Sequence, residues 1–464
     1  MVPLGEAKDL VLLVRGKLLG RGARSFVACA PQDVGSFVPS SLALLRTRAC
    51  APQDDSRGFR PRVVLALAMM LALVSAARAS AAADDTLLVS LRREELERAR
   101  ASVQRSDSVL RPAFERLLRD AEQALVAGPF SVTDKKRVPP SGDRHDYMSL
   151  GPYWWADSTK ANGLPYVRHD GRRNPETLDD YDAPRLKQMT DAVTTLVLTY
   201  YFTGDERYAA RAAQLLRVWF IAPDTRMNPR LAYAQAIPGI TQGRGIGIIE
   251  TRGLVRVLDA IKLLESFPGW TAEDRRQIRA WMSAYLAWLL TSRNGKDELA
   301  AQNNHGSWYD AQTAALALFL GRPALTRRIV EASKRRRIAV QIRADGRQPL
   351  EEARTRSLDY SIFNLEALMQ LAELGRKVGV DLWKYQASNG GSIRRALDYL
   401  ATYADTTKRW KGEQITPIDP MRMFEIVRMG EVVFNDTSYS ALIARMPEDR
   451  VRSHRLQLLY PPHA

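Results

Sequence analysis

The chain has 464 residues, of which 45% are hydrophobic and 26% charged, a globular composition that excludes a wholly disordered, collagen-like or multi-span membrane protein. The 68 Lys and Arg outnumber the 52 Asp and Glu, and this net charge of +16 favours polyanionic partners such as nucleic acid, an anionic membrane surface or an acidic polysaccharide. Five His and two Cys leave little material for a zinc or iron–sulfur site.

The first predicted element is a secretory signal peptide at residues 57–83. Three arginines precede an apolar run over 63–75, and small residues follow it up to Ala83. This is the signal pattern, and the run is shorter than the ~20 residues that cross a bilayer. A buried core helix or an uncleaved anchor is the alternative. Because a signal belongs at the start of a chain, we expect residues 1–56 to be a poorly ordered extension from a start site assigned too far upstream.

Removal of residues 1–83 changes the chemistry available to the mature chain. This prefix carries eleven Lys and Arg against five Asp and Glu, so ten of the sixteen net positive charges remain after cleavage. Both cysteines, Cys29 and Cys50, also lie in the prefix. We therefore expect a periplasmic or secreted protein without disulfides or thiol catalysis.

The mature chain is predicted to be helical along most of its length. Apolar residues recur at three- and four-residue steps, and Pro or Gly marks many of the junctions. The predicted helical stretches are 86–126 (two helices), 183–203, 206–221, 250–266, 272–293, 307–320, 323–341, 358–379 and 392–404. Strand-like alternation is weak and confined to 414–435.

About ten helices in antiparallel-looking pairs, with no short repeat period, predict an all-α fold of the α/α toroid type. We expect one toroid domain over 84–405 and an irregular tail over 406–464. Two long segments, 129–182 and 223–249, interrupt the helices, and loops of this length are seldom inert. The second contains Gly243, Gly245 and Gly247, which lack the context of a dinucleotide loop and indicate a tight backbone approach instead.

Three polar segments are candidates for chemistry. In the first, Asn303, Asn304 and His305 precede an apolar helix that Ser307 is expected to cap, a place that favours an anion. The alternative is that the Asn side chains only cap the helix and that His305 is a core residue.

The second segment contains Arg354, Arg356 and Tyr360. Arg356 and Tyr360 share a helix face, whereas two arginines two positions apart point in nearly opposite directions on a helix. Both arginines therefore face one cleft only if the segment is partly non-helical. A surface ladder of Arg and Glu is the alternative.

The third segment is Tyr153-Trp154-Trp155 in the first long loop, with seven Lys and Arg nearby. Aromatic rings among cations suit a sugar ring that carries a carboxylate, and they also suit single-stranded nucleic acid. Export argues against nucleic acid. The alternative is that the two tryptophans only fasten the loop to the core.

These segments together resemble the alginate lyase family of polysaccharide lyases, which have an α/α toroid fold. The resemblance covers most of 140–400 and rests on the order Asn304-His305, Arg354/Arg356, Tyr360 and on Tyr153-Trp154-Trp155. One departure is that two arginines compete for one expected role.

The resemblance implies β-elimination at a uronate, without a metal or an organic cofactor. Asn304 with Arg354 or Arg356 would neutralise the C5 carboxylate, and His305 would complete this site or act as the base. Tyr360 would move protons to and from the sugar, helped by cationic neighbours that lower its pKa from about 10. We expect the catalytic residues Asn304, His305, Arg354 and Tyr360, and the substrate-binding residues Tyr153, Trp154, Trp155, Arg244, Trp308 and Arg356.

The expected partner is an acidic polysaccharide such as alginate, bound by a monomer, with no nucleic acid and no membrane after signal cleavage. Two other functions remain open. A toroidal glycoside hydrolase would use a pair of carboxylates. The candidates are Asp157, Glu250 and Glu351, but their spacing in the sequence does not single out a pair. A non-catalytic glycan-binding protein would use the same cleft without turnover.

Overall fold

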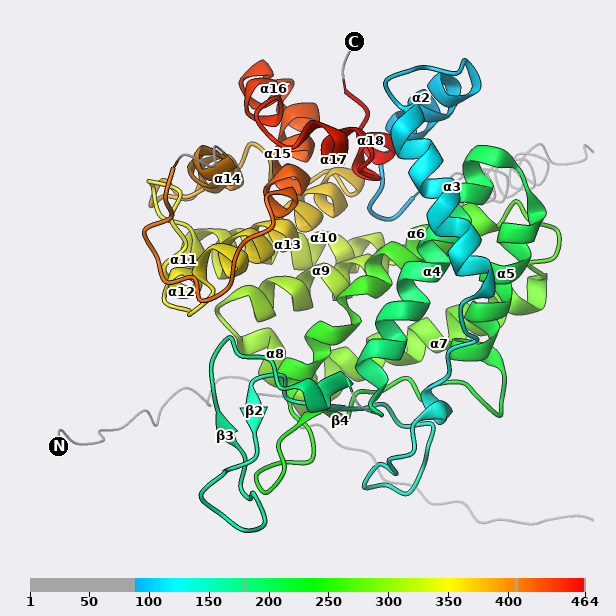
Figure 1. Cartoon of the computed structure of the whole chain (residues 1–464), viewed down its shortest axis with the longest axis vertical. Coiled ribbons are helices and arrows are strands. Elements are labelled where there is room, and N and C mark those ends of the chain that lie inside the picture. Colours follow the sequence, from blue (N-terminus) through cyan, green and yellow to red (C-terminus); the bar gives the residue numbers. More distant parts are fainter. Residues whose placement is uncertain (1–87, 179, 405–407, 463–464) are drawn as a thin grey trace, which may run out of the picture. The chain divides into compact units, whose positions relative to one another are not determined.

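The computed structural model describes residues 88–178, 180–404 and 408–462, all within one compact unit that spans Met69–Ala464. The predicted extension and signal peptide lie outside the described residues. Among the residues that are described, no helix is long and apolar enough to cross a membrane. Figure 1 shows a predominantly helical protein, as predicted.

Helices account for nearly all the regular structure. The α-helices of the N-terminal half are α2 (Arg93–Gln104), α3 (Arg111–Val126), α4 (Asp182–Thr203), α5 (Glu206–Leu216), α6 (Leu254–Leu264), α7 (Ala272–Thr291) and α8 (Arg293–Ala300). Those that follow are α9 (Asn304–Phe319), α10 (Pro323–Ser333), α11 (Ala339–Gln341), α12 (Pro349–Glu352), α13 (Ser357–Lys377) and α14 (Ile393–Ala401). The last four are α15 (Met421–Phe434), α16 (Thr437–Ile443), α17 (Glu448–Arg452) and α18 (Leu456–Leu459).

Short connections make sequence neighbours pack in pairs. Gly204 ends α4 in the left-handed conformation, at φ +73°, and the Asp205 side chain caps the backbone N–H of Arg207 at the start of α5. Since only these two residues join helices that contact each other, α4 and α5 run antiparallel. α9 also packs on α10, and α13 packs on α9 (Figure 1).

α9 lies at the centre of this arrangement and contacts α6, α7, α8, α10 and α13. Every residue of α9 is buried except His305, so the helix is enclosed around its whole circumference, and its buried residues include the polar Asn304 and Asp310. His305 is thus the residue of α9 that solvent or a ligand reaches most readily.

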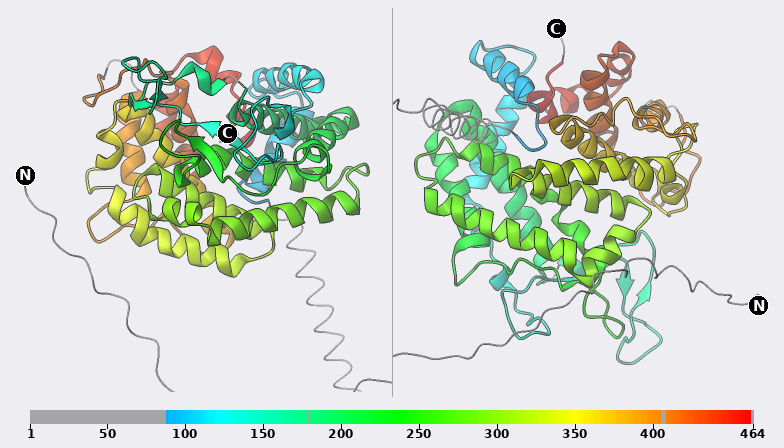
Figure 2. Two further views of the ribbon diagram at one scale, coloured as in Figure 1. Left: turned by 90° about the horizontal axis from the view of Figure 1, so that it is seen from below. Right: turned by 180° about the vertical axis from the view of Figure 1, so that it is seen from behind.

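The two long non-helical segments meet each other. Strand β1 (Met148–Leu150) pairs in parallel with β4 (Tyr233–Ala236), and β2 (Trp154–Trp155) pairs antiparallel with β3 (Val167–Arg168). A buried ion pair of 3.0 Å between Lys135 and Asp182 anchors the first segment to α4. The strands gather beside α8 at one end of the helices (Figures 1 and 2).

Several element predictions are wrong in detail. α8 was not expected, and the predicted helix 250–266 begins as a 3₁₀ segment, η4 (Gly245–Gly253), before α6. The strand-like stretch near 414–435 is mostly the helix α15. The tail expected to be irregular holds α15–α18, and Phe424 and Val451 belong to the same hydrophobic core as the toroid helices.

Candidate active site

His305 stands on the first turn of α9 with one ring nitrogen already engaged. The side chain of Asn303 caps the helix by accepting from the His305 backbone N–H. Nδ1 of His305 lies 2.8 Å from Oε1 of Glu298, the buried acid near the end of α8. When Nδ1 donates to the Glu298 carboxylate, Nε2 is the ring nitrogen that faces away from this contact. His305 is partly exposed and is not a core residue.

Asn304 is held by a second buried carboxylate. Its backbone N–H and its Nδ2 each donate to Glu351, at 2.6 Å, while its Oδ1 is buried without a partner among the described residues. The expected cap by Ser307 is wrong, because α9 starts three residues earlier and the Ser307 hydroxyl donates to Gln341 inside the core.

The segment around the two arginines is interrupted, as the prediction of a shared cleft required. α12 ends at Glu352 and α13 begins at Ser357, so residues 353–356 are not helical. The Arg354 guanidinium lies 4.0 Å from the centroid of the Tyr360 ring and forms two hydrogen bonds to Asp170, of 2.8 and 3.1 Å. Arg356 pairs with Asp359.

Tyr360 and Tyr153 share a hydrogen bond. The Tyr360 hydroxyl lies 2.6 Å from the Tyr153 hydroxyl, which joins α13 to the first long loop. Burial raises the pKa of Tyr360, Tyr153 raises it further, and the opposing effect of Arg354 is smaller than that of burial. Burial thus outweighs the expected lowering by a cationic neighbour, and the Tyr360 phenol of the free protein is protonated.

Four of the predicted residues line one cavity. It has a volume of about 730 Å³ and receives side chains from α4, α6, α13, α15 and both ends of the described chain. The predicted residues on its wall are Tyr153, Trp308, Arg356 and Tyr360, and other charged residues there are Lys187, Arg252, Arg256, Arg422 and Arg455 with Asp191, Asp359, Glu366 and Glu425.

Asn304, His305 and Arg354 are not on that wall, but they are linked to it through Glu351. Burial raises the pKa of the Glu351 carboxyl, and hydrogen bonds from Asn304 and the charges of Arg354 and His305 oppose this rise. Arg354 in turn stacks on Tyr360. The structure thus links Asn304 to Arg354 through Glu351 and Arg354 to Tyr360, while His305 is joined to them only as the residue that follows Asn304 in the chain.

The aromatic segment and Arg244 form the opposite side of this network. The Arg244 guanidinium lies 5.9 Å from the centroid of a Trp154 ring, and its Nε and Nη2 donate to the backbone and side-chain oxygens of Gln235. Trp155 donates from Nε1 to the backbone oxygen of Arg172 and is only half-buried. Trp155 thus contributes to fastening the loop, whereas Trp154 presents its ring beside a cation.

Gly243, just before η4, and Gly245, at its start, allow the close approach of backbone segments that was predicted from the sequence. A Cβ at Gly243 would lie 2.0 Å from the backbone oxygen of Ala232, and one at Gly245 would lie 2.6 Å from the backbone oxygen of Asn294 in α8. Only glycine permits the Arg244 segment to pack against β4 and α8 at once.

Sequence reasoning missed Glu298, Asp170 and Gln235. Glu298 lies in a stretch with no apolar period, and Asp170 and Gln235 lie in segments whose fold cannot be read from local pattern. The carboxylates considered for a hydrolase are not paired: Glu250 accepts from Tyr147 and Ser149, and Glu351 accepts from Asn304.

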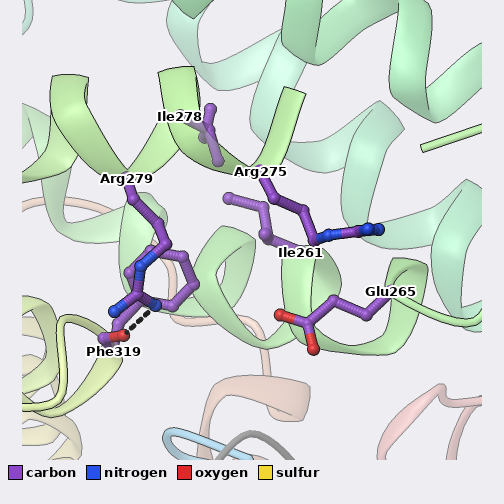
Figure 3. Close-up of a pocket in the computed structure, with 6 residues that line it drawn as sticks. All are labelled: Ile261, Glu265, Arg275, Ile278, Arg279 and Phe319. Atoms are coloured by element: carbon purple, nitrogen blue, oxygen red, sulfur yellow. Dashed lines mark hydrogen bonds between the residues drawn. The ribbon is translucent and has the colours of Figure 1, made fainter. Parts of the chain in front are cut away.

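A second pocket lies elsewhere. It has a volume of about 580 Å³ and contains none of the predicted site residues; Figure 3 shows the Arg279 guanidinium donating to the backbone oxygen of Phe319 at its edge. Its lining consists of Ile261, Glu265, Arg275, Ile278, Arg279 and Phe319.

Comparison with known proteins places the chain in a family. The family model described as alginate lyase matches residues 131–410. An alginate lyase from Bacteroides ovatus, known from its crystal structure, is 37% identical over 81% of this chain and 99% of that one, with a TM-score of 0.78. A search of curated proteins gives no significant match.

More distant structures share the fold. Alginate lyase A1-III from Sphingomonas species A1 is 18% identical over 82% of this chain and 99% of that one, with a TM-score of 0.53. A variant of alginate lyase A1-III complexed with a tetrasaccharide is also 18% identical, over 82% and 97%, with a TM-score of 0.55. The predicted all-α toroid is confirmed. The chain belongs to the alginate lyase family and is a polysaccharide lyase.

Proposed function

We propose that this protein cleaves alginate, or a closely similar uronate polymer, by β-elimination. The observation that carries the proposal is the Tyr360 hydroxyl, which lies on the cavity wall, with Arg354 over its ring and Tyr153 at 2.6 Å. Family membership and the Bacteroides ovatus alginate lyase support alginate as the substrate. The tetrasaccharide complex of a distant structural neighbour is consistent with a cavity that takes several sugar units.

β-Elimination needs a base at C5 and an acid at the leaving oxygen. The base removes the C5 hydrogen, the electrons of that bond form the C4–C5 double bond, and the C4–O bond breaks. The leaving oxygen then takes a proton from the acid. Tyr360 is protonated in the free protein because burial raises its pKa, so it is supplied with the proton that the leaving oxygen needs.

Two residues are equipped to take the C5 hydrogen. Nε2 of His305 is a free base when Nδ1 donates to Glu298. Tyr360 can serve as base only after its phenol proton has passed to solvent; the resulting phenolate takes the C5 proton and then donates it to the leaving oxygen, so the protons balance. Mannuronate and guluronate differ in configuration at C5, so the hydrogen faces opposite sides of the ring in the two sugars. On one epimer Tyr360 performs both transfers, and on the other His305 is the base.

The cavity wall matches a polymer with one carboxylate per sugar. Its basic side chains come from four different helical regions: Lys187 from α4, Arg252 and Arg256 from η4 and α6, Arg422 from α15 and Arg455 beside α18. These basic residues outnumber the acids Asp191, Asp359, Glu366 and Glu425 on the same wall, and an excess of positive charge attracts an anionic chain.

We also propose export to the periplasm or the medium, which would place the protein where such polymers occur. The support is the signal pattern at 57–83. N-terminal sequencing of the exported protein should find a start near residue 84, and a mature chain that begins before residue 60 would contradict export by this signal.

A substrate panel tests the proposed function. The purified protein is incubated with polymannuronate, polyguluronate, polyglucuronate and glycosaminoglycans, and ultraviolet absorption of the unsaturated sugar end is followed. We expect absorbing products from an alginate block, and their loss with Tyr360→Phe. New reducing ends without ultraviolet absorption would show a hydrolase, and tight binding without products would show a glycan-binding protein.

A further inference from the structure

We propose that Arg244 is the arginine that binds the C5 carboxylate of the reacting uronate, in place of Arg354 and Arg356. The inference rests on the proposed function and names the residue that would neutralise the substrate's charge. It arises from a difference in pairing among the three arginines that surround the network of Tyr360 and His305.

Arg354 and Arg356 already have carboxylate partners. The Nη2 and Nε of Arg354 bind the two oxygens of Asp170 at 2.8 and 3.1 Å, which is the two-point geometry that a substrate carboxylate would also need. Arg356 makes two hydrogen bonds to one oxygen of Asp359. The charge of each arginine is therefore already partly neutralised by a protein carboxylate before any substrate binds.

Arg244 has no such partner among the described residues. Its only hydrogen bonds go to two neutral oxygens of Gln235, at 3.0 and 3.1 Å, and Nη1 makes none. The nearby acids are occupied, since Glu250 accepts from Tyr147 and Ser149 while Glu298 holds His305. Burial and the charge of Arg168 lower the pKa of Arg244 to about 10, and the opposing charges of Glu250 and Glu298, neither of which binds it directly, do not offset this.

The backbone around Arg244 is built to hold this unpaired cation in place. Gln235 has a φ of +48°, which side-chain-bearing residues rarely adopt, and both of its oxygens accept from Arg244. Gly151 packs closely on the same side chain, since a Cβ there would lie 2.9 Å from Nη2 of Arg244 and 2.8 Å from Cδ1 of Trp154. The positive φ of Gln235, the residue that accepts both hydrogen bonds, indicates a functional constraint on the position of Arg244.

The position of Arg244 suits the reaction. Its guanidinium lies 5.9 Å from the Trp154 ring centroid, where a sugar face can stack. The next residue, Gly245, packs against α8 so closely that a Cβ would lie 3.2 Å from the backbone nitrogen of Glu298, the residue that orients His305. Arg244 therefore lies beside an aromatic ring, and its neighbour in the chain packs against the helix that carries Glu298.

The chemical consequence is stabilisation of the intermediate. When the C5 hydrogen leaves as a proton, its electron pair moves into the carboxylate, which gains negative charge until the C4–O bond breaks. A fixed cation without a competing anion interacts more strongly with this developing charge than with the ground state. Removal of Arg244 should therefore lower kcat as well as raise KM.

The test compares Arg244→Ala with the wild type and with Arg207→Ala, an exposed arginine on α5 that is 66% accessible and not on the cavity wall. On the preferred alginate block we expect kcat/KM to fall about 10²-fold for Arg244→Ala and to be unchanged for Arg207→Ala. Added guanidinium ion should restore part of the rate of Arg244→Ala and of no other variant. A methyl-esterified uronate, which has no carboxylate to bind, should reduce the difference between wild type and Arg244→Ala to a few-fold.

The outcomes separate this inference from the proposed function. If the wild type produces no unsaturated ends from any uronate polymer, the proposed function fails. If the wild type is active and Arg244→Ala keeps at least half of its kcat/KM, the assignment of Arg244 is overturned. Equal losses on the acid and ester substrates, without guanidinium rescue, would show that Arg244 only supports the fold, which also overturns it.

Discussion

Arg337 and Arg244 are two buried or partly buried arginines that differ in their partners: Arg337 has a carboxylate partner and Arg244 has none among the described residues. Arg337 is 2% exposed, binds Asp310 through Nε at 2.9 Å, and donates from its other two nitrogens to the backbone oxygens of Ala301 and Leu299. Arg244 has only the two oxygens of Gln235 and no carboxylate among the described residues.

The difference teaches how to separate structural from functional charge in this fold. A buried arginine such as Arg337, each of whose three nitrogens already donates a hydrogen bond within the protein, has a structural role and does not bind a ligand. A cation that is enclosed but incompletely paired destabilises the free protein and gains most when an anion arrives. The buried acids differ in a similar way. Asp310 pairs with the structural Arg337, whereas Glu298 and Glu351 bind the site residues His305 and Asn304.

The largest expected effect concerns Tyr360, the residue proposed to transfer protons. Tyr360→Phe removes one hydroxyl and its 2.6 Å hydrogen bond to Tyr153. We expect kcat to fall about 10³-fold, because general acid–base catalysis contributes on this scale, while the melting temperature changes little. Steady-state kinetics and thermal unfolding of the same preparation check this, and a variant that keeps near-full activity on every alginate block would remove Tyr360 from the mechanism.

Glu298→Gln tests the orientation of His305. The amide keeps the shape of Glu298 but can donate to Nδ1, which would place the ring proton on Nε2 and abolish the base. On the epimer that uses His305 we expect kcat to fall about 10²-fold, and on the other epimer the loss should be small. Equal rates for wild type and variant on both mannuronate and guluronate blocks would show that His305 is not a base.

A substitution on the structural side should affect stability and not chemistry. Arg337→Met leaves Asp310 buried without this partner and should reduce the free energy of unfolding by about 3–5 kcal/mol. Arg244→Met, by contrast, removes an unpaired cation and should leave stability unchanged or raised. Urea denaturation of both variants checks the pair, and the comparison fails if Arg244→Met is the more destabilised of the two.

The smallest expected effect concerns the ion pair between Arg354 and Asp170. Hydrogen bonds and charge from Arg354 hold the pKa of Asp170 at about 2, below its usual 3.8, against the opposing effect of burial. Because the folded-state pKa is lowered, Asp170 stabilises the protein above about pH 4, and this contribution is lost as the pH falls towards 2.

Asp170→Asn should therefore cost about 1 kcal/mol at neutral pH, given the partial exposure of this ion pair, and nothing near pH 2. Unfolding free energies measured across this range check the prediction. A stability difference that persists unchanged at low pH would show that the effect of the substitution is not electrostatic.

Much of the fold could be predicted because its helices have clear apolar periods. The stretch predicted as 183–203 is α4 (Asp182–Thr203), and 358–379 is close to α13 (Ser357–Lys377). α15 was misread since it is buried on several sides, which hides the helical period. α8 was missed because Arg293–Ala300 carries few apolar residues, although it supplies Glu298.

The proximity of several candidate residues could be predicted from the sequence, but their electrostatics could not. The order of Asn304, His305, Arg354 and Tyr360 is visible in the sequence, and the structure links Asn304 to Arg354 through Glu351 and Arg354 to Tyr360. Which arginine is already paired depends on Asp170, 184 positions away from Arg354, and no local pattern reveals that contact. The raised pKa of Tyr360 likewise results from tertiary burial.

The most direct test of the account is the product of alginate cleavage. Wild type and Tyr360→Phe are incubated with polymannuronate and polyguluronate, and the oligosaccharides are separated and examined by ultraviolet absorption and mass spectrometry. The account predicts that the wild type releases fragments with a C4–C5 double bond, each lighter by one water than the hydrolysis product, and that the variant does not. Saturated fragments from the wild type, or equal yields of unsaturated fragments from both proteins, would contradict it.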